Sequence, residues 1–134
     1  MVGSGYVGMS LSVLLAQHSD VTVLDIDAER VNKINSKQST VADKEIELFL
    51  VEKSLSLTVT LDKQVAYEDA RFIVVTTPTN YDTDTNCFDT SSVDAVVSDA
   101  LELNIDALVI IKSTIPVGHT KLLQERHVTD RVIF

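Results

Sequence analysis

Three of the four glycines in the chain lie within six positions, at Gly3, Gly5 and Gly8, in the spacing G-x-G-x-x-G. An apolar run follows, and then a valine-rich segment, 21–24, that ends at Asp25. A glycine turn, a helix and a strand with an acid at its end, in this order, match the layout of a dinucleotide-binding βαβ unit. Gly3 would permit the tight turn, Gly5 would let the backbone approach a pyrophosphate, and Gly8 would let the helix pack closely on the sheet.

Asp25 makes the glycine motif more specific, because glycine clusters also form ordinary turns. It follows Gly8 by 17 residues, close to the spacing of ~20 expected for a ribose-binding acid. Its carboxylate could accept hydrogen bonds from both hydroxyls of the adenosine ribose and would repel a 2′-phosphate, which favours NAD over NADP. A helix-capping role for Asp25 is the alternative, although Asp27 fits that role better.

Composition limits the class of protein. A chain of 134 residues, 45% of them hydrophobic, is long enough for one domain, over residues 1–134, with a substantial core. It has no apolar stretch of ~20 residues and no basic segment at its start, which argues against a membrane span and a signal peptide. The single cysteine, Cys87, excludes an internal disulfide, and the net charge of −9 argues against a nucleic-acid surface. We expect a cytoplasmic protein without a metal cluster.

Short Val- and Ile-rich segments alternate with helical patterns along the chain, which predicts an α/β, Rossmann-like, doubly wound and mostly parallel sheet. Only Met1 and Val2 precede Gly3, so the first strand is largely missing. A truncated start, a misplaced gene start or another segment in the empty position would each account for this. We expect an apolar N-terminal extension to raise the melting temperature. The predicted strands are 21–26, 57–61, 72–75, 108–111 and 132–134, and the predicted helices are 6–18, 28–35, 44–52, 63–69, 91–103 and 120–126.

Two predicted strands run into hydroxyl-bearing segments. Thr77, Pro78 and Thr79 follow the strand 72–75, at the end where open α/β sheets bind ligands. The threonines could bind the ribose or phosphate of the cofactor, and Pro78 would stiffen the turn. An ordinary Thr/Pro turn is the alternative. The loop 80–89 is polar and long for such a connection, which indicates a functional or mobile segment.

The segment 112–118 repeats this design after the strand 108–111. We expect Thr114 to face the same crevice as Thr79 and the glycine loop. Helix capping is the alternative for Ser113 and Thr114, and a solvated charge at the strand end is the alternative for Lys112.

Cysteine and histidine offer little further chemistry. Cys87 has no basic neighbour in the sequence that would lower its thiol pKa, so we do not expect it to be a nucleophile. The three histidines show no metal-ligand spacing and are expected at the surface or at helix ends; they are His18, His119 and His127.

Four ordered segments together resemble the UDP-glucose 6-dehydrogenases of the UDP-glucose/GDP-mannose dehydrogenase family: 3–8, 23–27, 77–81 and 111–118. The resemblance implies an N-terminal NAD-binding domain, which in the family precedes a central helix and a C-terminal domain. It also implies a homo-oligomeric full-length enzyme that oxidises the C6 alcohol of a UDP-sugar twice, giving UDP-glucuronate from UDP-glucose.

The resemblance also implies roles for individual residues. Asp25 matches the ribose-binding acid, and Arg30 a basic residue near the adenosine end. Thr79 and Thr114 match threonines near the nicotinamide half, and Thr114 would be catalytic by helping to position water. The pyrophosphate cradle would comprise Gly3, Ser4, Gly5, Tyr6, Val7 and Gly8.

Other features of the family are absent from the sequence. The Gly-rich motif of the catalytic cysteine is missing, as are the active-site lysine and glutamate segment, and Cys87 does not match that cysteine. Oxidation to the acid requires a nucleophile, so we expect the chain alone to be inactive.

Three alternatives stay open at this point. One is another nucleotide-sugar dehydrogenase, acting on GDP-mannose or a UDP-amino sugar. A second is a non-catalytic NAD-binding module. The third is an S-adenosylmethionine methyltransferase, in which the segment 112–116 would have no role.

Overall fold

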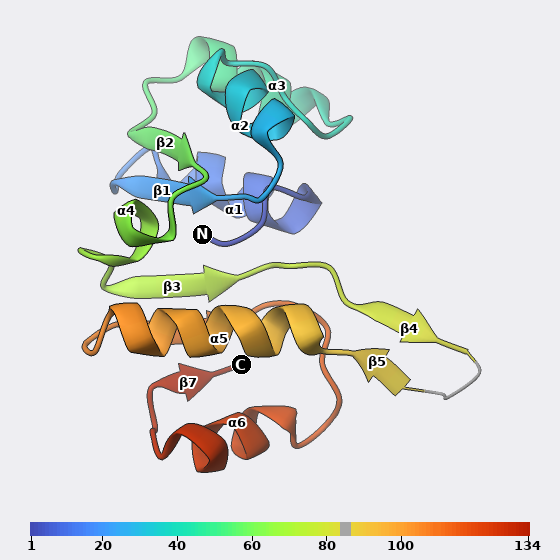
Figure 1. The fold of residues 1–134 in the computed structure, drawn as a ribbon. Coiled ribbons are helices and arrows are strands. Elements are labelled where there is room, and N and C mark those ends of the chain that lie inside the picture. The colour runs from blue at the N-terminus through green and yellow to red at the C-terminus, as the bar shows by residue number, and fades with distance from the viewer. Residues whose placement is uncertain (84–86) are drawn as a thin grey trace. The chain divides into compact units, whose positions relative to one another are not determined.

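The computed structural model describes residues 1–83 and 87–134. They form two compact units, Met1–Ala66 and Tyr67–Phe134. Each unit combines parallel strands with helices (Figure 1), so the predicted α/β class is confirmed. The prediction of a single domain stays a prediction. None of the described helices is long and apolar enough to cross a membrane.

The first unit has a parallel pair of strands, β1 and β2, in register from Val21 opposite Leu57 to Leu24 opposite Thr60. Its core joins side chains from three helices and both strands, among them Met9, Val23 and Ile46. The elements are α1 (Tyr6–Leu15), β1 (Val21–Leu24), α2 (Ala28–Asn35), α3 (Lys44–Glu52), β2 (Leu57–Thr60) and α4 (Lys63–Tyr67), whose last residue belongs to the second unit.

The first three residues, where the sequence predicts that the first strand is largely missing, pair with β1. The Met1 amino group donates to Thr22 O at 2.8 Å, and Leu24 N donates to Met1 O at 2.8 Å. Gly3 N donates back to Leu24 O at 2.8 Å, and Val2 forms a parallel bridge with Leu24. A short segment parallel to β1 is therefore present and leads directly into the glycine loop.

The second unit has a parallel sheet with the order β3-β6-β7. Helix α5 packs on β3 and β6, and α6 packs on β7. Side chains without exposed area fill the interior, including Val97 of α5 and Val109 of β6. The elements are β3 (Phe72–Val75), β4 (Asn80–Asp82), β5 (Cys87–Asp89), α5 (Ser91–Leu103), β6 (Leu108–Ile111), α6 (His119–His127) and β7 (Val132–Ile133).

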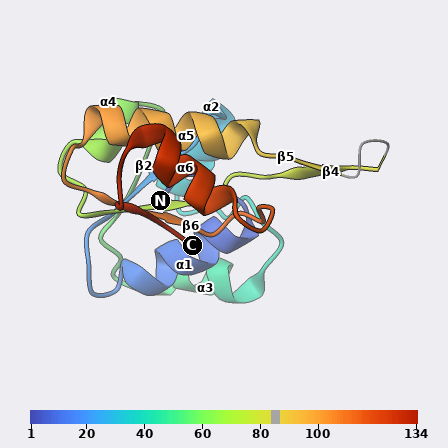
Figure 2. The ribbon, with the colours of Figure 1, turned by 90° about the horizontal axis from the view of Figure 1, so that it is seen from below.

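The segment predicted as a loop, 80–89, instead contains the antiparallel pair β4 and β5. This hairpin projects away from α5 and the strands of its unit (Figures 1 and 2). The rings of Tyr81 and Phe88 face each other across it with centroids 5.0 Å apart, and such cross-strand aromatic pairs stabilise hairpins. Positions 84–86 of this segment lie outside the described residues.

Predicted boundaries differ from the structure mainly at helix and strand ends. The helix expected over 6–18 ends at Leu15, with Ala16 as its C-cap. Residues 16–18 form a turn, in which His18 N donates to Leu15 O at 3.0 Å. The strand expected over 21–26 ends at Leu24. The helices expected over 28–35, 44–52 and 91–103 are present at those bounds.

Candidate functional site

The glycine loop connects the first residues to α1 and contains two glycines with different constraints. Gly3 has φ +99°, a left-handed conformation that favours glycine. Gly5 has φ −74° and is the N-cap of α1. A Cβ built on Gly5 would meet no atom within 4 Å. Neither backbone strain nor contact of a Cβ with the described residues therefore requires a glycine at position 5.

Helix α1 begins directly after this loop without a side-chain cap. Gly5 provides no capping group, and the first turn contains no acidic residue. The first N–H groups of a helix have no intrahelical acceptor, and together with the helix dipole they favour an anion. The side chains of Tyr6 and Val7 are exposed, whereas Gly8 is buried against the rest of the unit.

Asp25 lies directly after β1, and its carboxylate is tied to the glycine loop. Ser4 N donates to Asp25 Oδ2 at 2.8 Å, and Ser4 Oγ donates to the same oxygen. Asp27 N donates to Asp25 Oδ1 at 3.0 Å. Burial by itself would raise the pKa of Asp25, but these hydrogen bonds and the charge of Arg30 together lower that pKa below its ordinary value. The carboxylate is therefore ionised at neutral pH.

Asp27, and not Asp25, caps the next helix. Its Oδ1 accepts hydrogen bonds from Glu29 N at 2.9 Å and Arg30 N at 3.3 Å at the start of α2. The alternative of Asp25 as the cap is therefore wrong. Arg30 Nη1 also donates to Ser4 O at 3.4 Å, which brings this predicted residue to the glycine loop. Thr40, which none of the sequence motifs includes, also donates to Ser4 O through its Oγ1, at 3.4 Å.

In the second unit, the segments after β3 and β6 meet at the carboxyl end of the sheet. Ser113 Oγ donates to Thr77 O at 2.7 Å, and Ser113 N donates to Val75 O at 3.1 Å. Thr114 is exposed at this end, and Thr79 is half-buried. Since α6 is capped by Gly118, the alternative of Ser113 or Thr114 as its helix cap is wrong.

Ser92 is a further member of this cluster that sequence analysis missed. It is the second residue of α5. Its Oγ lies 2.9 Å from Pro78 O and 3.2 Å from Thr77 Oγ1, with hydrogen-bond geometry to both. The Thr77–Thr79 segment is thus held by one serine from α5 and another from the end of β6.

The remaining candidates do not lie in these clusters. His18 is exposed, and His119 Nε2 lies 2.6 Å from Asp94 Oδ1, which links α6 to α5. His127 Nε2 lies 3.4 Å from Ser98 Oγ. The side chain of Cys87 is outside what the structure describes. Within residues 1–83 and 87–134, no three His, Cys, Asp or Glu residues are grouped to hold a metal ion.

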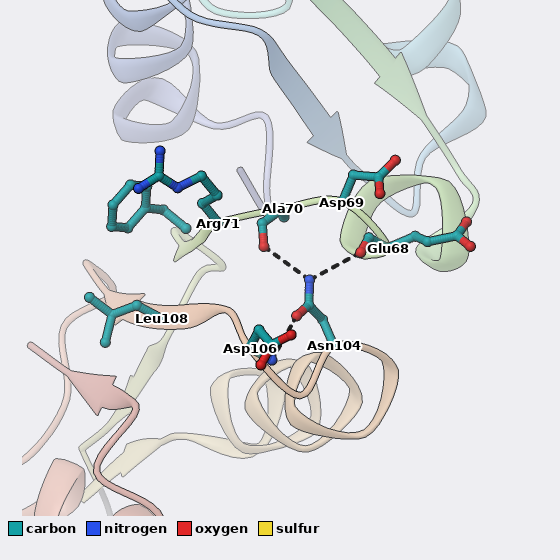
Figure 3. Close-up of a pocket in the computed structure, with 8 residues that line it drawn as sticks. Glu68, Asp69, Ala70, Arg71, Asn104, Asp106 and Leu108 are labelled. Carbon is teal, nitrogen blue, oxygen red and sulfur yellow. Dashed lines mark hydrogen bonds between the residues drawn. The ribbon is translucent and has the colours of Figure 1, made fainter.

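A pocket opens at the amino ends of β3 and β6, the end of the sheet opposite Thr77 and Ser113 (Figure 3). Asn104 spans it: its amide nitrogen donates to Tyr67 O, Glu68 O and Ala70 O at 2.6, 3.3 and 2.9 Å. Its Oδ1 accepts from the amides of residues 106 and 107 at 3.0 and 2.9 Å. These contacts satisfy the hydrogen-bonding groups of the Asn104 side chain. Asn104 therefore links the turn before β3 to the turn before β6 and offers nothing to a ligand.

The predicted site residues thus form two clusters, one in each unit. The first joins the glycine loop, Asp25 and Arg30, and the second joins Thr77–Thr79 to Ser113 and Thr114. The expectation that both clusters face one crevice stays a prediction.

Comparisons with known proteins show the family of the chain. A family model described as the NAD-binding domain of the UDP-glucose/GDP-mannose dehydrogenase family matches residues 1–132. Over 134 residues the chain is 49% identical to a UDP-glucose 6-dehydrogenase from Streptococcus pneumoniae, covering all of this chain and 34% of that protein. A UDP-glucose 6-dehydrogenase from Campylobacter jejuni is 38% identical over 136 residues, covering all of this chain and 35% of that protein. The chain therefore spans about a third of the length of these curated relatives.

Solved structures share the fold. The UDP-D-ManNAc dehydrogenase from Pyrococcus horikoshii matches with a TM-score of 0.84 and 30% identity, over 94% of this chain and 30% of that one. The UDP-glucose dehydrogenase from Pyrobaculum islandicum matches with a TM-score of 0.81 and 22% identity, over 95% of this chain and 31% of that one. The prediction of a Rossmann-like fold is confirmed.

Proposed function

Because the chain belongs to the UDP-glucose/GDP-mannose dehydrogenase family, as its NAD-binding domain, we propose that its two clusters hold the two halves of NAD in a UDP-glucose 6-dehydrogenase. The observation that carries this proposal is the open space over Gly5. A Cβ there would meet no atom of the described residues within 4 Å, so the role of glycine at this position would be to leave room for a ligand at the start of α1.

The glycine loop would hold the pyrophosphate. Gly3, Ser4 and Gly5 bring the backbone to the start of α1, where the amides of the first turn have no side-chain cap. Tyr6 and Val7 belong to that turn, and their exposed side chains would flank the ligand. Gly8 would serve by keeping α1 close to the strands.

Asp25 would bind the adenosine ribose. Each carboxylate oxygen has two acceptor sites. Ser4 occupies both on Oδ2 and Asp27 N occupies one on Oδ1, so one site on Oδ1 remains for a ribose hydroxyl. The lowered pKa of Asp25 keeps it charged, and a charged carboxylate repels a 2′-phosphate. NAD is therefore preferred over NADP. Arg30 lies beside this cluster through its contact with Ser4 O and would face the adenosine end.

The threonine cluster would serve the nicotinamide half. Pro78 stiffens the segment in which Thr77 and Thr79 lie, and Thr114 is exposed at the end of β6. NAD, when bound, supplies the acceptor for the hydride that leaves the sugar carbon. We assign Thr114 to the reacting centre, where its hydroxyl would help position water, and Thr79 to a contact with the cofactor.

The substrate we propose is UDP-glucose, oxidised at C6 to UDP-glucuronate. Its support is the identity to two relatives with the name UDP-glucose 6-dehydrogenase, 49% and 38%, against 30% to the UDP-D-ManNAc dehydrogenase. The full-length enzyme would act in the cytoplasm as a homo-oligomer, without a nucleic-acid or membrane partner.

Calorimetric titration of the purified chain tests the cofactor site. We expect NAD to bind with measurable heat, NADP to bind much more weakly, and S-adenosylmethionine not to bind. Heat from S-adenosylmethionine alone would overturn the proposal. The chain should not reduce NAD with UDP-glucose by itself, and steady turnover would show that the catalytic groups lie within these 134 residues.

A further inference from the structure

We propose that Ser92 and Ser113 are positioning residues for the nicotinamide half of NAD, because together they fix the Thr77–Thr79 segment from two sides. This inference rests on the proposed function, which gives Thr79 and Thr114 to that half of the cofactor. It concerns two side chains that would not touch the cofactor themselves.

Ser113 provides the first anchor. The residue is buried, with 6% of its surface exposed, so its hydroxyl requires a partner within the protein. That partner is Thr77 O, 2.7 Å away. Ser113 N and Lys112 N both donate to Val75 O, at 3.1 and 2.8 Å. Hydrogen bonding between β3 and β6 thus continues beyond the ends of the two strands. It links the residues just before Thr114 to the residues just before Thr79.

Ser92 provides the second anchor, from a different element. Ser92 lies in the first turn of α5, so its position is fixed by this helix and not by the Thr77–Thr79 segment that it contacts. The 2.9 Å contact to Pro78 O and the 3.2 Å contact to Thr77 Oγ1 hold consecutive residues of the loop. The donor to the Pro78 carbonyl is thus a side chain of α5 and not a group of the Thr77–Thr79 segment.

The two anchors meet at Thr77. Its carbonyl accepts from Ser113, and its hydroxyl lies within hydrogen-bond distance of Ser92. Fixing a binding loop before the ligand arrives lowers the entropy cost of binding. Loss of either serine hydroxyl should therefore weaken binding of the ligand part that contacts this loop, and leave unchanged the part bound at Gly5 and Asp25.

The experiment compares NAD with ADP, which has the adenosine diphosphate part and lacks the nicotinamide riboside. Kd values for both are measured by calorimetry on the whole chain and on Ser92→Ala, Ser92→Thr and Ser113→Ala. Ser98→Ala is the matched control, an exposed serine of the same helix α5. Circular dichroism and melting temperatures show whether each variant is folded.

For Ser92→Ala and Ser113→Ala we expect Kd for NAD to rise roughly two- to tenfold, the effect of one lost hydrogen bond, and Kd for ADP to stay unchanged. Ser92→Thr keeps the hydroxyl and should restore NAD binding, and Ser98→Ala should match the wild type. An unchanged Kd for NAD in the alanine variants, or an equal rise for NAD and ADP, would overturn the inference.

The result for the wild-type chain separates this inference from the proposed function. If the wild-type chain binds neither NAD nor ADP, the proposed cofactor site fails, and the role of the serines with it. If it binds both and the serine variants behave like wild type, only the inference fails. Should Ser113→Ala not fold, the comparison of Ser92→Ala with Ser92→Thr decides.

Discussion

Ser4 and Asp25 are joined twice, because the amide and the hydroxyl of Ser4 both donate to Asp25 Oδ2. The two residues are 21 positions apart in the sequence, on the glycine loop and just past β1. Their contact places the ribose-binding candidate beside the pyrophosphate-binding candidate before any ligand arrives. The same carboxylate therefore has a structural role and a proposed binding role, which the following predictions separate.

Replacing Asp25 should weaken cofactor binding. Asp25→Ala removes the proposed acceptor of the ribose hydroxyls, so we expect NAD affinity to fall by roughly 1–3 kcal/mol, the cost of leaving such groups unpaired. Calorimetric titration measures this, with the exposed Asp130→Ala as a control for lost charge. Unchanged affinity in Asp25→Ala would remove this residue from the site.

Asp25 should also make the free energy of unfolding depend on pH in the acidic range. A carboxyl group whose pKa is lower in the folded state stabilises the fold above its unfolded pKa of ~3.9. That contribution is lost as the pH falls through the folded pKa. We expect the wild type to lose more free energy of unfolding than Asp25→Asn between about pH 5 and pH 2. Urea denaturation across this range tests it, and parallel curves for the two proteins would contradict it.

Gly5 should be needed for the ligand and not for the fold. Its φ of −74° suits any residue, and a Cβ there meets no atom within 4 Å. Gly5→Val should therefore fold with a melting temperature close to wild type and lose NAD binding, because the branched side chain fills the space of the pyrophosphate.

Gly118 offers the opposite case and a matched control. A Cβ on it would also meet no atom within 4 Å, but its φ is +89°, where a β-branched residue is strained. Gly118→Val should lower the melting temperature and, in the folded fraction, retain ADP binding. If Gly5→Val still binds NAD, the glycine loop at residues 3–8 does not serve to hold the pyrophosphate.

Local sequence signals predict the helices well. Asp27 and Asp43 each accept amide hydrogen bonds from residues two and three positions later, which is a short-range interaction visible in the sequence. Helices α2 and α3 accordingly begin where the capping acids indicate. The glycine spacing likewise indicates the start of α1 at Tyr6.

Contacts between distant residues could not be predicted in this way. Ser113 and Thr77 are 36 positions apart, and Ser92 and Thr77 are 15 apart. Hydrophobic periodicity in the sequence does not indicate a hydrogen bond between a hydroxyl and a residue of another loop. The β4–β5 hairpin was missed for a related reason, because the pairing of Tyr81 with Phe88 stabilises it while the polar composition of 80–89 resembles a loop.

Tyr67 carries a buried hydroxyl for which the described residues provide no hydrogen-bond partner. Such a group costs free energy, so Tyr67→Phe should leave stability unchanged or raise it by about 1 kcal/mol. Burial, with a smaller effect of the Asp99 charge, raises the pKa of Tyr67 to about 12.

The raised pKa gives this variant a second readout. Folding favours the neutral phenol, so its contribution to stability is present below the unfolded pKa of ~10 and is lost as the pH rises toward 12. Denaturation curves between about pH 9 and 11.5 should show a steeper loss in wild type than in Tyr67→Phe. A marked loss of stability in Tyr67→Phe at neutral pH would mean that the hydroxyl has a partner after all.

Val128 ends α6 in a left-handed conformation, with φ 49° and ψ 53°. A β-branched residue is strained there, by about 1–2 kcal/mol, whereas asparagine tolerates this region and is common after helices. Val128 is 92% exposed, so little packing is lost on replacement. We expect Val128→Asn to raise the free energy of unfolding by roughly 1 kcal/mol, measured by urea denaturation. Val117→Asn is the matched control, since Val117 is at least as exposed as Val128 and has no positive φ. A gain of the same size in both variants would show that the stabilisation comes from removing an exposed apolar group and not from relieving the backbone.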